Sequence, residues 1–268
     1  MSGSTVIIKA INKDGYPVNA VSKSGSATLS QTVSGMVRTI TLSDISSNVT
    51  VTFDGFYHPL QWPADGVYVV QSDGTPVDPI FATTNCIGAA LSDNTTGQKL
   101  MIEKYEASNS SYATAASGKT STSIFYWGGY GTDQSISNIT STTVAEADYN
   151  GKSQSEVLKS VTTGGSGYTS YATIGAVLNQ YISNVTDNQG YTDWYIPASG
   201  QLYLISLNMA NINTALSAIG GTQLSDAYYW SSSEHNSSNG WFVYLPNGTV
   251  SDFIKNYYCR VRFVRDLS

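Results

Sequence analysis

The chain has 268 residues, of which 41% are hydrophobic and 12% charged, and its formal net charge is −6. This length gives room for one large domain or two smaller ones, with ample core. The acidic balance argues against nucleic acid or an anionic membrane as the main partner, because both need clustered lysine and arginine. Ser, Thr, Asn, Gly and 19 Tyr supply the polarity instead, a composition usual in extracellular β-rich and adhesive proteins.

No stretch approaches the roughly 20 apolar residues of a transmembrane helix, so we expect no membrane insertion. The start of the chain, Met1 to Thr5, shows neither the basic nor the apolar region of a secretory signal. The two cysteines, Cys86 and Cys259, lie far apart and have no metal-ligand spacing. They could form a disulfide, but two free thiols are favoured because a chain of this length does not need a cross-link.

The first fifty residues contain short apolar runs divided by Gly and Ser, at positions 6–11, 27–29, 37–42 and 48–53. Short strands at such spacing predict a small antiparallel sandwich. The segment 13–18, Lys-Asp-Gly-Tyr-Pro-Val, is predicted to be a turn, and it resembles the first hairpin of immunoglobulin-like or carboxypeptidase-regulatory-like β modules. We therefore expect residues 1–54 to form a small all-β, immunoglobulin-like domain for attachment or spacing.

Proline and glycine crowd together between Gly55 and Ala64, which predicts a boundary and a second domain over 55–268. Strands are expected near 67–70, 86–91 and 99–103. Residues 109–123 are polar and low in complexity, which is typical of a surface loop. The apolar run 124–127 is expected to be buried.

Helices follow in the middle of this second domain. Residues 153–156, Ser-Gln-Ser-Glu, fit a capping box. Apolar residues at helical spacing predict helices near 174–182 and 199–208, and a third helix near 212–219 with Asn211 as its cap and Gly220 as its stop. Helices in the middle with hairpins at the end indicate an α+β fold.

The C-terminal stretch alternates at period two, with Trp241, Val243 and Leu245 on one side and Phe242 and Tyr244 on the other. This pattern predicts a half-buried strand. The Asn247-Gly248 pair predicts a type I′ hairpin turn, and 250–254 the return strand. The second face of this hairpin is aromatic and polar, which is typical of rigid binding surfaces. An ordinary solvated hairpin face is the alternative.

No catalytic arrangement can be recognised. The only histidines, His58 and His235, stand in no Ser/His/Asp or His-x-x-His pattern, and the acidic residues are scattered. We find no nucleophile with a base and no metal cluster, so we expect a protein that is not an enzyme and that needs neither metal nor cofactor.

Several motifs from about Asp65 onward resemble C-type-lectin-like domains of the subgroup common in gut bacteria and their phages. They are Ala-Asp-Tyr-Asn-Gly-Lys-Ser at 147–153, Asp-Trp-Tyr-Ile-Pro-Ala-Ser-Gly-Gln-Leu at 193–202, Ile-Asn-Thr-Ala-Leu at 212–216 leading into Ile-Gly-Gly at 219–221, Tyr-Trp-Ser-Ser-Ser-Glu at 229–234, Gly-Trp at 240–241 and Val-Arg-Phe-Val-Arg at 261–265. The resemblance implies a C-type-lectin-like fold for this domain. Formylglycine-generating enzymes share the fold but need a cysteine pair near the end, where Cys259 stands alone. Calcium-dependent sugar binders need Glu-Pro-Asn or Gln-Pro-Asp with Trp-Asn-Asp, and neither set is present.

The chain looks most like the variable proteins of diversity-generating retroelements, in which asparagine codons of the gene become Tyr, Ser, Asp, His, Phe or Thr. Within about 227–260, residues of a scaffold type alternate with assorted residues that are reachable from an asparagine codon. The resemblance implies a variable ligand-binding surface made of Tyr228, His235, Asn236, Ser238, Asn239, Phe242, Tyr244, Thr249, Ser251, Asp252, Phe253, Asn256, Tyr257 and Tyr258.

The resemblance also implies a function. We expect a non-enzymatic adhesin that binds a protein or glycan of a host cell surface, most simply a receptor-binding protein of a phage tail, displayed on the virion together with other tail components. Such adhesins often form trimers, which add avidity, so a homotrimer is one expected assembly. The alternatives are a bacterial cell-surface or pilus-tip adhesin, and a fixed structural domain of a virion or cell envelope.

Overall fold

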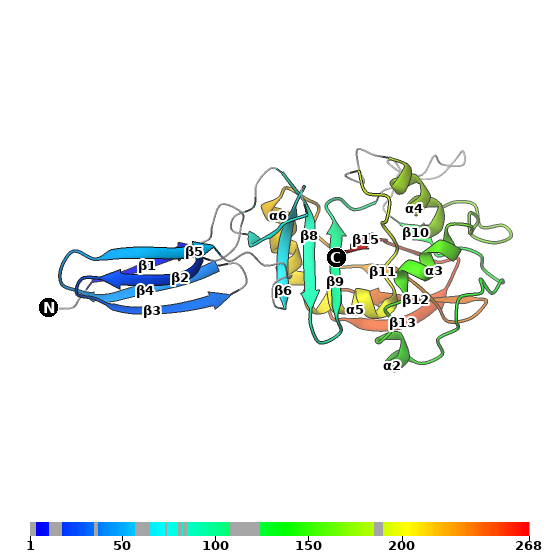
Figure 1. Ribbon diagram of the computed structural model, residues 1–268. Helices are drawn as coiled ribbons and strands as arrows, with labels where there is room; N and C mark the ends of the chain where they lie inside the picture. The colour runs from blue at the N-terminus through cyan, green and yellow to red at the C-terminus, as the bar shows by residue number, and fades with distance from the viewer. Residues whose placement is uncertain are drawn as a thin grey trace.

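The computed structural model describes residues 4–10, 18–34, 37–56, 65–72, 74–79, 82, 85–107, 124–184, 190–267 (Figure 1). Strands outnumber helices in these ranges. The fold is therefore α+β with a majority of β-structure, as the sequence predicted. Membership of the C-type-lectin-like fold stays a prediction. The expected loop at 109–123 and most of the expected boundary at 55–64 lie outside the described residues.

The first five strands form two antiparallel sheets at one end of the molecule (Figure 1). They are β1 (Ser4–Ala10), β2 (Val18–Ser24), β3 (Thr28–Ser34), β4 (Val37–Ile45) and β5 (Thr50–Phe56). One sheet has the order β1-β4-β3, and the other pairs β2 with β5. Their shared core is small, with Val21, Ile40 and Leu42 buried. The predicted antiparallel strands are present, but the sequence did not predict β2. Its Asn, Ser and Lys residues leave too few apolar side chains to show the apolar–polar alternation of a strand.

A five-stranded antiparallel sheet joins the start of the second unit to the end of the chain. It contains β6 (Gly66–Gln71), β7 (Pro76–Val77), β8 (Cys86–Asp93), β9 (Gln98–Glu103) and β15 (Val264–Asp266), in the order β15-β9-β8-β6-β7. Alternate residues of β6, β8 and β9 point into two different cores, for example Ala89 into one and Ala90 into the other. Strands buried on both faces explain why 86–91 is an almost continuous small or apolar run.

Three of the five described helices lie at or near the positions that apolar spacing predicted, and a fourth lies where the capping box was expected. The helices are α2 (Thr142–Ala145), α3 (Gly151–Leu158), α4 (Ile174–Ser183), α5 (Ser199–Leu207) and α6 (Met209–Ala218). The apolar residues at helical spacing on α6 are buried. Gly220 follows the end of this helix and has φ of +68°. Asn208, rather than Asn211, precedes the first turn of α6. None of the described helices is long and apolar enough to span a membrane.

The expected capping box at Ser153 is wrong. Helix α3 already begins at Gly151, so Ser153 lies inside the first turn, where its hydroxyl donates to the carbonyl oxygen of Asn150 at 3.0 Å. The helix can start here because residue 151 is a glycine. A Cβ at this position would lie 2.4 Å from Oε1 of Gln201, which is too close for any other residue. The glycine lets the helix begin directly against the segment that precedes α5.

The remaining strands build the C-terminal hairpins. Strands β11 (Tyr228–Glu234), β12 (Asn239–Tyr244) and β13 (Thr249–Ile254) form one sheet, and β10 (Phe125–Tyr126) pairs with β14 (Tyr258–Cys259). A parallel bridge joins Tyr229 to Arg260, with backbone hydrogen bonds of 2.9 Å on both sides of it. Both cysteines are buried and free, as expected.

Candidate functional site

The sheet of β11, β12 and β13 has one face whose central side chains are buried in the protein core. Tyr229 lies opposite Val243, and Val243 opposite Val250. These residues and Trp241 are buried in one core cluster. The predicted alternation is therefore confirmed, and the sheet is fixed by this face, which leaves the other available.

The turn between β12 and β13 differs from the prediction. Tyr244 pairs with Thr249, so four residues connect the strands rather than two. Gly248 has φ of +71°, whereas Asn247 is not among the described residues with positive φ. A type I′ turn needs positive φ at both central positions, so that assignment is wrong. Pro246 explains the longer turn, because its fixed φ suits the first central position of a type I turn.

Exposed and half-buried aromatic rings gather on the second face and beside it. We call this set the ring strip, and it contains Tyr228, Phe242, Tyr244, Phe253, Tyr257 and Tyr258. Each ring contacts the next: centroids are 4.8 Å apart for Tyr228 and Tyr244, 5.2 Å for Tyr228 and Phe242, and 4.5 Å for Phe253 and Tyr257. Tyr257 and Tyr258 stack nearly parallel at 4.6 Å. Such pairs hold each other in place beyond simple burial.

Tyrosines from two distant segments continue this strip. Tyr171 lies 5.2 Å from Tyr258 and 5.3 Å from Tyr126, measured between ring centroids. Tyr168 then contacts both Tyr126 and Tyr130. Backbone pairing causes this approach, because β10 pairs with β14 while the amide of Tyr126 donates to the carbonyl oxygen of Ala172 at 2.9 Å. The predicted binding set did not include these tyrosines, although the Gly-, Ser- and Tyr-rich composition of 164–171 is typical of binding loops.

A hollow of about 190 Å³ opens within the strip. Tyr228, Phe242, Phe253, Tyr257 and Cys259 line it. Burial raises the pKa of the Cys259 thiol, so this sulfur stays protonated and is a weak nucleophile. The hollow therefore offers an apolar surface of about one side chain's size rather than a reactive group.

The polar members of the predicted set gather at the β11–β12 turn. The side-chain oxygen of Asn236 accepts from the amides of Ser238 and Asn239 at 2.8 and 2.9 Å. The Asn239 amide nitrogen donates to Oδ2 of Asp252 at 2.6 Å, and the His235 ring lies 3.8 Å from the same oxygen. Asp252 lies opposite Trp241, so this polar turn belongs to the opposite side of the hairpin from Phe242.

The other predicted residues take separate places. Ser251 lies opposite Phe242 on the ring-strip face, while Thr249 donates to the Asn247 side chain beside the β12–β13 turn at 2.8 Å. The side-chain oxygen of Asn256 is buried without a hydrogen-bond partner among the described residues. Most of the predicted set is thus brought together in two groups, the ring strip and the polar turn. Ser251 and Thr249 lie opposite ring-strip residues, and Asn256 belongs to neither group.

A buried ion pair stands behind both groups. Lys255 and Glu234 have fully buried side chains and bond to each other. The ammonium group also donates to the carbonyl oxygen of Thr132 at 2.9 Å and lies 4.6 Å from the ring centre of Trp127. Glu234 in turn accepts from the amide of Gln134 at 3.0 Å. This cluster ties the display segment, residues 228–260, to the loop that follows β10.

A second buried network joins the motifs that carried the family resemblance. Oδ2 of Asp148 accepts from the Ser233 hydroxyl at 2.6 Å and from the Gln154 amide at 2.7 Å. Ser199 donates to the Ser233 oxygen from both its hydroxyl and its backbone amide at 3.0 Å. All these side chains are buried. The motif residues thus fix α3 and α5 against β11 and position the display segment from beneath.

Within the described ranges, no group of three or more His, Cys, Asp or Glu side chains could hold a metal ion. Comparison with protein-family models and with curated proteins gives no match. Among solved structures, a fimbrial protein from Bacteroides ovatus is similar with a TM-score of 0.48 and 18% sequence identity, over 99% of this chain and 71% of that one. A likeness of this size supports no conclusion about function.

Proposed function

We propose that the protein is a non-enzymatic adhesin that binds a host cell-surface protein or glycan through the ring strip and the polar turn. The observation that carries this proposal is the exposure of large rings on a fixed backbone. Tyr228 is 50% exposed, and Phe253, Tyr257 and Tyr258 are 38–42% exposed. Rings that are already held in position lose little entropy on binding, which is why Tyr and Trp dominate binding hot spots.

We further propose that this surface is diversified on a C-type-lectin-like scaffold by a retroelement. The two faces of the sheet support this idea. Tyr229, Trp241, Val243 and Val250 are buried, whereas the ring-strip residues Tyr228, Phe253, Tyr257 and Tyr258 are exposed. Substitutions at outward positions change stability by about 0.5 kcal/mol or less in general. A gene could therefore vary these codons without losing the fold.

The biological setting follows from the same proposal. A phage tail receptor-binding protein, acting as a homotrimer among other tail components, would use residues 1–54 for attachment and the display segment for host recognition. A bacterial cell-surface or pilus-tip adhesin is the alternative setting. A second class of function is a fixed structural domain whose rings pack against another subunit, which the exposed apolar area of Phe253 favours.

Binding to cells tests the proposal. Phe253→Ala and Tyr257→Ala, labelled with a fluorophore, are compared with wild type on a panel of intact gut-bacterial cells. We expect cell labelling to fall at least about tenfold while the melting temperature is kept, as for a hot spot worth about 1.4 kcal/mol or more. Tyr105→Ala is the matched control, because Tyr105 is 45% exposed and is not part of the strip.

Two results would contradict this function. Cell labelling that survives both substitutions would move the binding site elsewhere. Loss of assembly by mass photometry, with cell labelling intact, would favour the structural class instead. Diversification is tested separately at the gene: a near-copy of the segment for residues 228–267 beside a reverse-transcriptase gene, differing almost only at adenines, is expected.

A further inference from the structure

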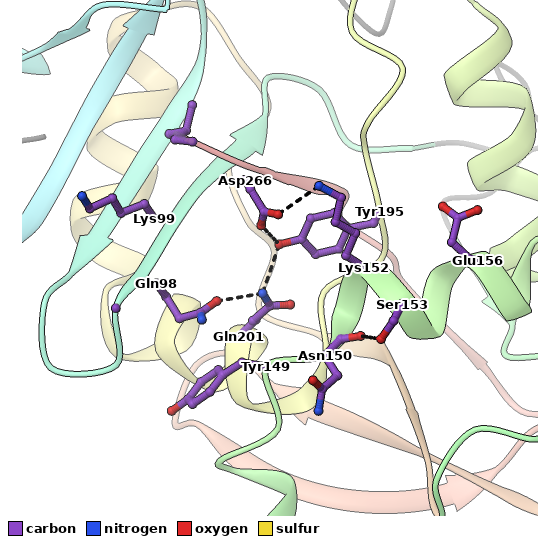
Figure 2. A pocket seen from close by; sticks show the side chains of 12 residues that line it. Gln98, Lys99, Tyr149, Asn150, Lys152, Ser153, Glu156, Tyr195, Gln201 and Asp266 are labelled. Carbon is purple, nitrogen blue, oxygen red and sulfur yellow. Dashed lines mark hydrogen bonds and ion pairs between the residues drawn. The ribbon is translucent and has the colours of Figure 1, made fainter.

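A second pocket, of about 660 Å³, shares no lining residue with the ring strip. Figure 2 shows its lining side chains. It opens between the β8–β9 turn, the start of α3 and the last strand, β15. These elements meet because β15 pairs with β9, and because Lys152 at the start of α3 forms an ion pair of 3.2 Å with Asp266. The pocket is therefore built by segments that the fold already holds together.

A continuous chain of polar side chains forms the floor (Figure 2). The Gln201 amide donates to Oε1 of Gln98 at 2.8 Å and to the Tyr195 hydroxyl at 3.0 Å. Tyr195 donates to Asp266 at 2.5 Å, and Asp266 accepts from Lys152. Tyr195 and Gln201 are only 1% and 2% exposed, so their positions are fixed before any ligand arrives. Preorganised polar groups at the base of a concave site are what orient a small ligand.

An aromatic ring stands beside this floor. Tyr149 lines the pocket next to Gln98, as Figure 2 shows, and its buried side packs against a core cluster. A ring supported from behind offers a flat apolar surface, and its hydroxyl stays available at the edge. The combination of one flat ring with several hydrogen-bonding groups suits a ligand that has an apolar face and hydroxyl edges.

The charges of the lining cancel. Lys99 and Lys152 contribute two positive charges, and Glu156 and Asp266 contribute two negative charges, so the formal sum is zero. Lys152 is paired with Asp266, and Glu156 is paired with Lys159 at 2.6 Å, so Lys99 is the one lining charge without an ion pair among the described residues. A single lysine at the rim is a weak attraction for a phosphate or an acid, which proteins usually bind with several cations or a bidentate arginine.

We propose that this pocket binds a neutral saccharide, with a sugar ring stacked on Tyr149 and its hydroxyls bonded to the polar floor. Such a ligand satisfies both acceptors and donors without separating the Lys152–Asp266 pair. This site is independent of the ring strip, and it needs no metal ion.

Saturation-transfer NMR with the methyl glycosides of glucose, galactose, mannose and N-acetylglucosamine, and with lactose, maltose and cellobiose, tests the proposal. We expect transfer to at least one of these neutral sugars with wild-type protein. Tyr149→Ala should weaken binding at least tenfold. Ser153→Trp is the second variant: Ser153 is exposed at the pocket edge, so the indole should block the space while the fold is kept.

The control is Tyr105→Ala, which should bind the sugar as wild type does, because Tyr105 is exposed and belongs neither to the pocket nor to the ring strip. Three results would overturn the proposal: no transfer to any of these sugars, transfer that is unchanged in Ser153→Trp, or binding restricted to glucuronate and glucose 6-phosphate. Loss of transfer in Tyr257→Ala alone would assign the sugar to the ring strip and would equally overturn it.

Discussion

Lys255 and Glu234 form an ion pair with no exposed side-chain surface, directly behind the segment that carries the ring strip. Desolvation lowers the pKa of Lys255, while the carboxylate of Glu234 opposes this shift. The pair is completed by Thr132 and Gln134, whose backbone groups bond to the lysine and the glutamate. The position of the loop after β10 thus depends on two charges in the display segment. These two buried charges in turn need the hydrogen bonds that the loop supplies.

Removing one partner of this pair should be costly. Lys255→Met leaves the Glu234 carboxylate buried without its cation, and we expect the free energy of unfolding to fall by about 3–5 kcal/mol. Urea denaturation followed by tryptophan fluorescence measures the change. The double variant Lys255→Met/Glu234→Gln should recover part of the loss. Equal stability of the single variant and wild type would show that the pair is not needed.

Stability should also depend on pH through Glu103. This side chain is completely buried, and burial raises its pKa to about 8 against the attraction of Arg262. Below pH 4.5 the carboxyl is protonated in both states. Between pH 4.5 and about 8 the unfolded chain releases this proton while the folded chain keeps it, so folding stability should decrease across that range. The total is on the order of 4 kcal/mol.

Denaturation at a series of pH values checks this expectation. Glu103→Gln carries no titrating group, and its stability should change less between pH 5 and 8 than that of wild type. The difference between the two curves isolates the contribution of Glu103. Parallel curves would mean that this carboxyl titrates with an ordinary pKa.

Gly175 should resist substitution although it lies in a helix. Alanine in place of a helical glycine usually stabilises by up to about 1 kcal/mol. Here a Cβ would lie 1.8 Å from the carbonyl oxygen of Leu158, at the end of α3. We therefore expect Gly175→Ala to destabilise by about 2 kcal/mol or more. The exposed Ser183→Ala on the same helix should stay within about 0.5 kcal/mol of wild type in the same denaturation experiment.

Cys259 should react slowly in the native protein. Burial keeps its pKa raised, and only the thiolate attacks alkylating reagents. In a Cys86→Ala background, labelling by iodoacetamide at pH 8 should be at least about tenfold slower than in denaturant. Fast labelling of the folded protein would indicate that the hollow in the ring strip opens to solvent.

Tyr171 tests whether the strip extends beyond the display segment. Its ring contacts both Tyr126 and Tyr258, so Tyr171→Ala should lower cell labelling with a smaller effect on stability than a core substitution. A loss of about threefold or more is expected, since rings at the edge of an interface contribute less than central ones. Tyr105→Ala again serves as the control. Unchanged labelling would confine binding to residues 228–260.

Periodicity made much of this fold predictable from the sequence. The alternation of Trp241 to Leu245 and the stripe of Ile174, Leu178 and Tyr181 each reflect one buried face, and both are confirmed. The starts of α3 and α6 were not predictable from side-chain type alone, whereas the stop at Gly220 was. The start of α3 depends on close contact between Gly151 and Gln201, which no local pattern records.

The candidate surface was only partly predictable for a related reason. The six ring-strip residues lie within one segment, so a local pattern could find them. Tyr126, Tyr130, Tyr168 and Tyr171 join them only through the pairing of β10 with β14 and with the segment at Ala172. Nothing in the spacing of these residues records that pairing. The second pocket similarly needs β15 beside β9, and those strands are more than 160 residues apart in the sequence.

The bridge between Tyr229 and Arg260 holds the two ends of the display segment side by side. The separation of these two ends is set by backbone hydrogen bonds from Trp230 to Arg260 and from Arg260 to Tyr228, and not by the residues between them. The intervening stretch also carries both members of its internal ion pair. It is therefore a cassette whose exposed positions protein engineers could randomise, on a scaffold that supplies the loop of Thr132 and Gln134 and the Asp148 and Ser199 side chains that bond to its buried Ser233.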